Sequence, residues 1–273
     1  KYNITNFSGS MLISNDAGTG TLSSASNNTG IGHEVFDDIT TGDSNTAVGY
    51  QAMAANTTGG ANTAIGLNAL DENVDGSNNT AVGFTSSYCT TTGCENTSVG
   101  DSALRFNITG DGNVAVGFCA LKCNNGSTPD YNVAVGRQAM FSNTTGLRNN
   151  ALGLNAMYSN TTGACNVAIG GNALYTNTTA SNNVAIGSCS LEVNTTGAQN
   201  VAIGQGALDA NTTAGNNTAA GYNALGENTT GANNVAVGST ALAVSTTGTR
   251  NTAVGPGYAK GAGKALTTGT DNV

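Results

Sequence analysis

The chain has 273 residues and a formal net charge of −8, with only 9% charged residues and no tryptophan. Ordinary globular domains carry about a quarter charged residues, so this composition is not that of a typical globular domain. The eight Lys and Arg residues form no run along the sequence, which argues against a nucleic-acid-binding protein. No apolar stretch of about 18 residues is present, so we expect no membrane insertion by this segment.

Residues 1–27 contain no complete repeat and are rich in Asn, Ser, Thr and Gly. We expect them to form a lead-in or cap segment. From residue 28 a short motif recurs, as in residues 45–49 (Asn-Thr-Ala-Val-Gly), and its glycine returns every 17 residues except for one interval of 19, from Gly117 to Gly136. A fixed short period predicts a stack of coils over residues 28–271. Residues 272–273 are interpreted as the start of a further coil, and we expect the chain to be a fragment of a longer fibre.

The positions within one coil are numbered from the motif glycine, which is position 0. Position −4 is Asn, −3 is mostly Thr or Val, −2 is nearly always Ala, and −1 is mostly Val or Ile. Ala-Leu or Ala-Met occupies +3 and +4 in most coils, and Asn-Thr-Thr-Gly often occupies +7 to +10. Short β-branched segments between Gly and Asn predict strands and argue against helices. The predicted fold is therefore all-β: a parallel β-solenoid of about 14 coils, with two short strands and two turns per coil.

The asparagine at −4 is expected to form a ladder, in which each side-chain amide bonds the amides above and below it. A second candidate ladder is the Asn at +7, for example Asn56 and Asn73. The predicted −4 ladder comprises Asn28, Asn45, Asn62, Asn79, Asn96, Asn113, Asn132, Asn149, Asn166, Asn183, Asn200, Asn217, Asn234 and Asn251.

Side chains alternate along a strand, so positions −2 and 0 are expected to face inward and −3 and −1 outward. A row of Val and Ile on the outside needs a cover, and the simplest cover is another copy of the chain. We therefore predict a homo-oligomer of parallel subunits, or an end-to-end filament of them. The predicted subunit interface comprises Val48, Ile65, Val82, Val99, Val116, Val135, Ile169, Ile186, Ile203 and Val237.

Residues 166–170, 183–187 and 200–204 all read Asn-Val-Ala-Ile-Gly. They resemble the head repeats of YadA-like trimeric autotransporter adhesins, and the strings with Tyr-Gln-Ala-Met and Asn-Thr-Thr-Gly also look like repeats of phage tail fibres. The resemblance implies a left-handed parallel β-roll, trimeric along its length and extracellular, on a cell or virion surface. It implies a structural fibre with a role in adhesion or host attachment, and a surface receptor or glycan as partner. The alternative function is that of a phage or virus tail-fibre shaft.

Six cysteines favour an oxidising, extracellular setting with disulfides over a zinc site: Cys89, Cys94, Cys119, Cys123, Cys165 and Cys189. Cys94 and Cys165 each precede a motif glycine by six or five residues, and Cys119 and Cys189 each follow the next motif glycine by two. Within one chain these positions lie at opposite ends of a strand, beyond the roughly 7 Å that a disulfide allows between Cα atoms. We therefore predict inter-chain bonds Cys94–Cys119 and Cys165–Cys189, with Cys89 and Cys123 left unassigned.

Asn-x-Ser/Thr sequences at +7 are candidate glycosylation sites, although a purely structural role in turns and ladders is the favoured interpretation. They begin at Asn56, Asn107, Asn143, Asn160, Asn177, Asn194, Asn211 and Asn228.

Little in the sequence suggests catalysis. His33 is the only histidine and is interpreted as a surface residue near Glu34, Asp37 and Asp38. We expect no enzymatic activity, no cofactor and no metal. Two rival functions remain: an ice-binding solenoid, suggested by the column Thr46, Thr63, Thr80 and Thr97, and a polysaccharide-acting β-solenoid, which would need clustered acids in long loops.

Overall fold

The computed structural model describes residues 11–13, 24–125, 130–257 and 269–271. All regular secondary structure in these ranges is β, in strands of three residues each. The chain divides into two compact units, Lys1–Arg137 and Gln138–Val273. The strands of the first unit are β1 (Met11–Ile13), β2 (Thr29–Ile31), β3 (Thr46–Val48), β4 (Thr63–Ile65), β5 (Thr80–Val82), β6 (Thr97–Val99), β7 (Val114–Val116) and β8 (Val133–Val135). Those of the second are β9 (Asn150–Leu152), β10 (Val167–Ile169), β11 (Val184–Ile186), β12 (Val201–Ile203), β13 (Thr218–Ala220), β14 (Val235–Val237) and β15 (Thr252–Val254).

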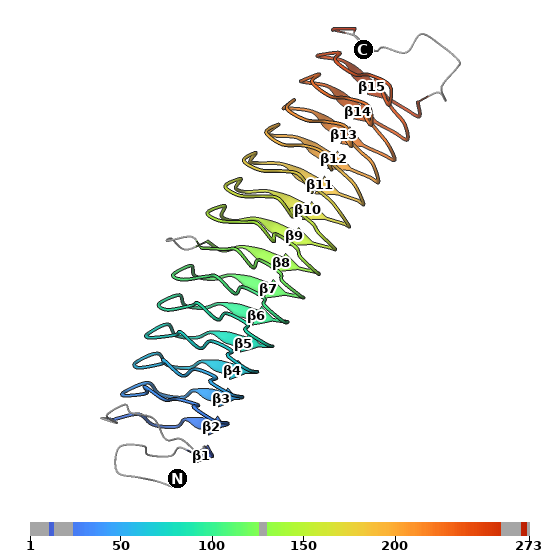
Figure 1. Cartoon of the computed structure of the whole chain (residues 1–273). Coiled ribbons are helices and arrows are strands. Elements are labelled where there is room, and N and C mark those ends of the chain that lie inside the picture. The colour runs from blue at the N-terminus through green and yellow to red at the C-terminus, as the bar shows by residue number, and fades with distance from the viewer. Residues whose placement is uncertain (1–10, 14–23, 126–129, 258–268, 272–273) are drawn as a thin grey trace. The chain divides into compact units, whose positions relative to one another are not determined.

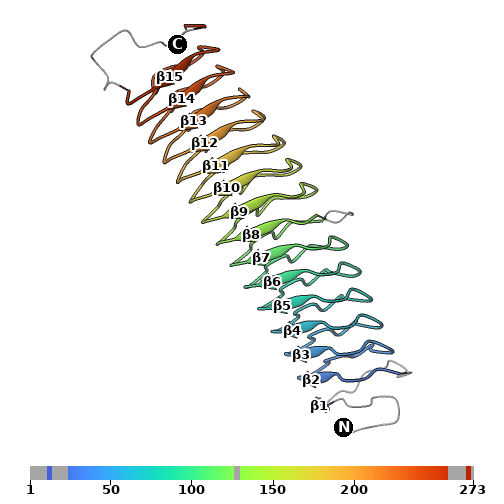
Figure 2. The same ribbon diagram turned by 180° about the vertical axis from the view of Figure 1, so that it is seen from behind.

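In each unit, every strand pairs in parallel with the next strand along the chain. Equivalent residues stand side by side, for example Thr46 with Thr63 and Ala47 with Ala64 in the first unit. Figures 1 and 2 show the strands lying one above another along one wall of the coils, while the remaining segments form the other wall. The prediction of a parallel β-solenoid with a 17-residue period is confirmed. The left-handed winding of the solenoid that the resemblance implies stays a prediction.

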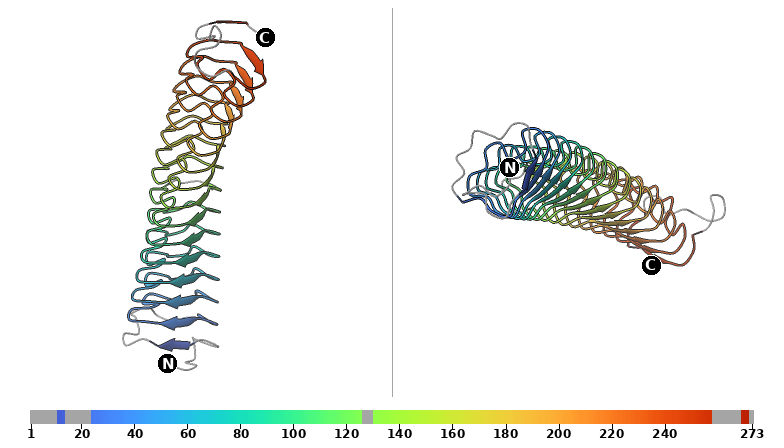
Figure 3. Two further views of the ribbon diagram at one scale, coloured as in Figure 1. Left: turned by 90° about the vertical axis from the view of Figure 1, so that its right-hand side faces the viewer. Right: turned by 90° about the horizontal axis from the view of Figure 1, so that it is seen from below.

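The interior of the coils is lined by apolar side chains and by asparagine side chains. Ala47 at −2, Ala52 at +3 and Met53 at +4 are fully buried, and so are the asparagines at −4 and +7, such as Asn45 and Asn56. The left-hand view of Figure 3 shows the strands on one side of the coils and the connecting segments on the other. Alanine fits the strand wall because the opposite wall supplies the larger Leu or Met.

The prediction of two strands per coil is wrong, because each coil has one. After the motif glycine, alternate residues have positive φ, as at Gln51 (52°) and Met53 (54°). This alternation prevents a second pleated strand, yet the backbone still bonds neighbouring coils. The Gln51 N–H donates to the His33 carbonyl of the preceding coil, and the Met53 N–H donates to the Ala69 carbonyl of the following coil. We call the segment from +2 to +7 the turn wall (residues 51–56 in this coil).

The motif glycine is required by both conformation and space. Gly49 has a φ of 143°, and a Cβ atom there would collide with the carbonyl oxygen of Gly66 in the next coil. Position 0 therefore does not line the interior as predicted. Its missing side chain lets consecutive coils approach each other.

The solenoid begins earlier than predicted. β1 lies within the expected lead-in segment and pairs with β2, and Ala25 is fully buried in the core. At the other end Thr270 bridges Thr249, and the Asn251 side chain donates to the Gly269 carbonyl, so residues 269–271 resume the columns of the preceding coil. Residues 126–129 within the 19-residue interval and residues 272–273 lie outside the described residues.

Candidate functional site

The asparagines at −4 form a ladder, but mainly through the backbone. The Asn45 N–H donates to Asn28 Oδ1 at 2.8 Å, and Asn45 Nδ2 donates across its own coil to the Gly59 carbonyl at 2.9 Å. Direct amide-to-amide bonds occur at a minority of coils, such as Asn96 Nδ2 to Asn79 Oδ1 at 3.2 Å. The predicted ladder therefore exists, while its predicted bonding pattern is corrected.

The asparagines at +7 form the amide-to-amide ladder that was expected at −4. Asn177 Nδ2 donates to Asn160 Oδ1 at 2.8 Å and to the Ala180 carbonyl at 3.1 Å. All eight candidate glycosylation sites belong to this column, and their residues are fully buried. A glycan on Nδ2 would break these bonds and would have to pass through the coil wall, so the fold contradicts glycosylation at Asn56, Asn107, Asn143, Asn160, Asn177, Asn194, Asn211 and Asn228.

One carboxylate takes part in the same interior network at the 19-residue interval. Asp130 is fully buried, and its Oδ2 accepts from Asn124 Nδ2 at 2.7 Å and from Asn113 Nδ2 at 3.4 Å. In other coils a backbone carbonyl at +10 accepts from both amides, so Asp130 substitutes for that carbonyl. Burial raises the pKa of Asp130, and its Oδ1 has no hydrogen-bond partner among the described residues.

The predicted outward column at −1 does face outward. Ile65 (41%) and Ile203 (43%) are exposed, while Val48 and Ile186 are half-buried and the −2 alanines between them are inaccessible. An adjacent apolar column lies at +1, a position to which the sequence pattern assigned no role. Its exposed members are Tyr50, Leu67, Phe84, Phe118, Leu154 and Tyr222. We call the columns −3, −1 and +1 together the strand face. The threonines at −3, such as Thr63, are half-buried parts of this face.

All six cysteines are unbonded in the single chain. Cys165 is exposed and Cys189 is half-buried, whereas Cys119 is only 4% exposed and would have to be uncovered before a neighbour could reach it. Cys94 Sγ accepts from the Ser77 N–H at 3.4 Å, so this thiol takes part in the contact between coils. The two inter-chain bonds stay predictions. Burial raises the pKa of Cys89 to about 11, which leaves that thiol protonated and unreactive at neutral pH.

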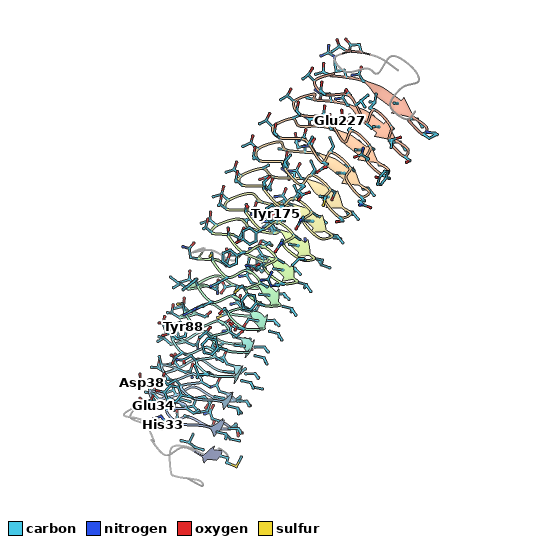
Figure 4. All side chains as sticks on the ribbon, turned by 45° about the vertical axis from the view of Figure 1, so that its right-hand side comes forward. His33, Glu34, Asp38, Tyr88, Tyr175 and Glu227 are labelled. Carbon is cyan, nitrogen blue, oxygen red and sulfur yellow. The ribbon has the colours of Figure 1, made fainter. Side chains whose placement is uncertain are left out.

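His33 lies against an aromatic ring and a carboxylate. Its ring stacks on Tyr50 with centroids 5.5 Å apart, and its Nδ1 lies 3.4 Å from Glu34 Oε1. Figure 4 shows Glu34 and Asp38 beside it at the edge of a coil. Within the described ranges no group of three or more His, Cys, Asp or Glu side chains is placed to hold a metal ion.

The turn wall carries stacked side chains on consecutive coils of the second unit. Phe141, Tyr158 and Tyr175 all occupy +5, and their ring centroids are 5.1 and 5.3 Å apart. Because the rings face each other along the stack, they present edges to solvent and stabilise the contact between coils.

None of the described residues forms a helix long and apolar enough to cross a membrane. No protein-family model matches this chain, and no curated protein or solved structure matches it either.

Proposed function

We propose that this chain is a structural module of an extracellular fibre, in which the strand face packs against further copies of the same chain. The single observation that carries the proposal is the exposed aliphatic column at −1. Exposed apolar patches of this extent mark interaction sites. A β-solenoid is typically structural, and we propose no catalytic role.

A second copy is the partner that fits this surface best. The column repeats at the coil spacing of ~4.8 Å, so a parallel copy presents the same spacing along the whole contact. Ile65, Ile169 and Ile203 are each about 40% exposed and would all be covered by such a copy. Three copies around one axis would cover every strand face in a closed assembly, and we propose a trimer for that reason.

The location of the fibre is proposed from the resemblance of the repeats to adhesin head repeats and to tail-fibre repeats. Both place the module on a cell or virion surface, and six cysteines agree with an oxidising environment. Attachment to a host receptor or glycan is the role we propose for the complete fibre.

Sedimentation of the purified chain tests the assembly. Wild type is expected to sediment as an oligomer, and Ile65→Asp to shift it toward monomer because a charge would be buried in the interface. Thr58→Asp is the matched control, since Thr58 is exposed at +9 on the turn beyond the turn wall. Ile203→Asp repeats the test in the second unit.

Far-ultraviolet circular dichroism checks that each variant keeps its β structure. A wild-type chain that is monomeric at every concentration would refute the proposal. Equal dissociation by Thr58→Asp would also refute it, because the effect would then not belong to the strand face.

A further inference from the structure

The described residues include only five Lys and Arg side chains, and three of them gather on consecutive coils of the first unit. These are Arg105 and Lys122, both at +5, and Arg137 at +1. All three charges act on the thiol of Cys119 at +2. Burial raises the pKa of the Cys119 thiol, and the nearby charges of Lys122, Arg137 and Arg105 lower it. Asp101 is the one carboxylate that acts on the same thiol. We call the three cations the basic corner.

Aromatic rings lie between these cations. The Arg105 guanidinium carbon is 5.3 Å from the centroid of Phe106, and Lys122 Nζ is 5.9 Å from the same ring. The Arg137 guanidinium is 5.6 Å from the centroid of Phe118. Both rings remain accessible, at 39% for Phe106 and 45% for Phe118. The corner therefore presents positive charge beside exposed apolar carbon.

The two arginines of the basic corner are poorly compensated by the described part of the protein. Neither arginine of the basic corner has a carboxylate within ion-pair distance in the part of the chain that the structure describes. Arg105 Nε is buried there without a hydrogen-bond partner. Arg105 and Lys122 also share a column on adjacent coils, about 4.8 Å apart along the stack, where like charges destabilise. An anion between them would turn this repulsion into attraction and supply an acceptor.

We propose that the basic corner binds an acidic saccharide through its sulfate groups. A guanidinium recognises such groups with paired N–H donors, and an ammonium adds a second charge. The C–H groups of a sugar ring match the exposed carbon of Phe106, which lies at +6 on the turn wall. A long polyanion such as nucleic acid is disfavoured by the net charge of −8 and by Asp101 and Glu95 nearby in the sequence. Arg105, Lys122 and Phe106 lie on the turn wall, so assembly through the strand face leaves them open. Arg137 and Phe118 lie at +1 on the strand face and would be covered.

Isothermal titration calorimetry on the full chain tests the proposal with three probes: a sulfated hexasaccharide, its desulfated counterpart of equal length, and inorganic sulfate. The sulfated saccharide is expected to bind, and to bind more weakly as salt rises above about 0.15 M. Inorganic sulfate alone is expected to bind at least about tenfold more weakly, because it lacks the ring contacts. Equal binding of the two saccharides, or of inorganic sulfate and the sulfated saccharide, would overturn the proposal.

Charge removal locates the site. Arg105→Gln and Lys122→Gln are each expected to weaken the sulfated saccharide about tenfold or more, since hydrogen bonds to charged groups are the stronger class. Arg148→Gln is the matched control, because Arg148 is an exposed cation outside the corner; it should change affinity less than about twofold.

Equal losses in all three variants would overturn the assignment. So would dissociation of the oligomer by Arg105→Gln, because the corner would then be a contact between copies. The thermal midpoint of each variant, measured beside wild type, verifies folding. The sedimentation of Ile65→Asp tests the proposed fibre function separately, so failure of one proposal leaves the other measurable.

Discussion

The amide ladder at +7 is interrupted at one coil of the first unit, and repairing it is expected to stabilise the protein. Thr90 occupies +7 there, is fully buried, and has no hydrogen-bond partner for its Oγ1 among the described residues. Asn73 on the preceding coil is left with a buried Oδ1 that has no partner either. The same defect recurs where Ser245 follows Asn228. We predict that Thr90→Asn raises the stability of the coils around it.

The magnitude follows from the intact coils. There each Asn Nδ2 donates both to the Asn Oδ1 of the preceding coil and to its own +10 carbonyl, as at Asn177. Thr90→Asn gives Asn73 Oδ1 the donor that it lacks. Leaving a buried acceptor unsatisfied costs about 1–3 kcal/mol, and ordering the longer side chain offsets part of the gain. We expect a net stabilisation of about 1–2 kcal/mol.

Native-state hydrogen exchange is the suitable assay, because a repeat array need not unfold in one step. A gain of about 1–2 kcal/mol slows exchange roughly 5–30-fold for amides that open with these coils. The amides of β5 and β6 are the reporters. Asn177→Thr reproduces the defect in the second unit and is expected to accelerate exchange by a similar factor. Unchanged exchange in Thr90→Asn, together with faster exchange in Asn177→Thr, would refute the assignment of the defect to the missing donor.

Three further predictions test the interior. Leu174→Ala empties a fully buried site and should cost about 2–5 kcal/mol in chemical denaturation, whereas Leu67→Ala, at an exposed position, should change the stability of the isolated chain by about 0.5 kcal/mol or less. The raised pKa of Asp130 means that the native state holds the Asp130 proton more tightly than the unfolded chain does. Ionised Asp130 therefore lowers the free energy of unfolding at pH values above its folded pKa. This loss of stability vanishes at pH values below the unfolded pKa of about 3.9. Asp130→Asn should therefore raise the thermal midpoint at neutral pH and leave it unchanged near pH 3, roughly one unit below that value; an effect of equal size at both would contradict this. Intact mass after expression in a glycosylating host should show Asn177 and the other +7 asparagines unmodified, and a glycan on any of them would contradict their burial.

The strand wall could be predicted from the sequence because its rules are local. Side chains alternate along a strand, so the small Ala47 had to face inward once Val48 was assigned to the outside. The asparagine at −4, such as Asn45, recurs in every coil because its side chain forms hydrogen bonds with backbone groups. The period itself fixes the register, since a parallel neighbour 17 residues away places identical residues side by side.

The turn wall could not be predicted in the same way. Its buried Met53 and Leu70 have positive φ, which residues other than Gly, Asn and Asp rarely adopt. No local preference of Leu or Met favours that conformation, so hydrogen bonds to the coils above and below must impose it. The N–H of Leu70, for example, donates to the carbonyl of Ser86 in the next coil. Because the positive φ depends on hydrogen bonds between stacked coils, the sequence of one coil does not predict it.

The basic corner escaped detection for a related reason. A search for basic runs compares neighbours along the chain, but the neighbours of a solenoid residue lie one period away. Arg105 and Lys122 are 17 residues apart and stand on adjacent coils at the same position. Reading the +5 column would have paired them. Adding Arg137 requires the further knowledge that +1 and +5 both border the residue at +2, which depends on the fold of the turn wall. In a protein of this kind, charge must be counted down the columns before a binding surface is excluded.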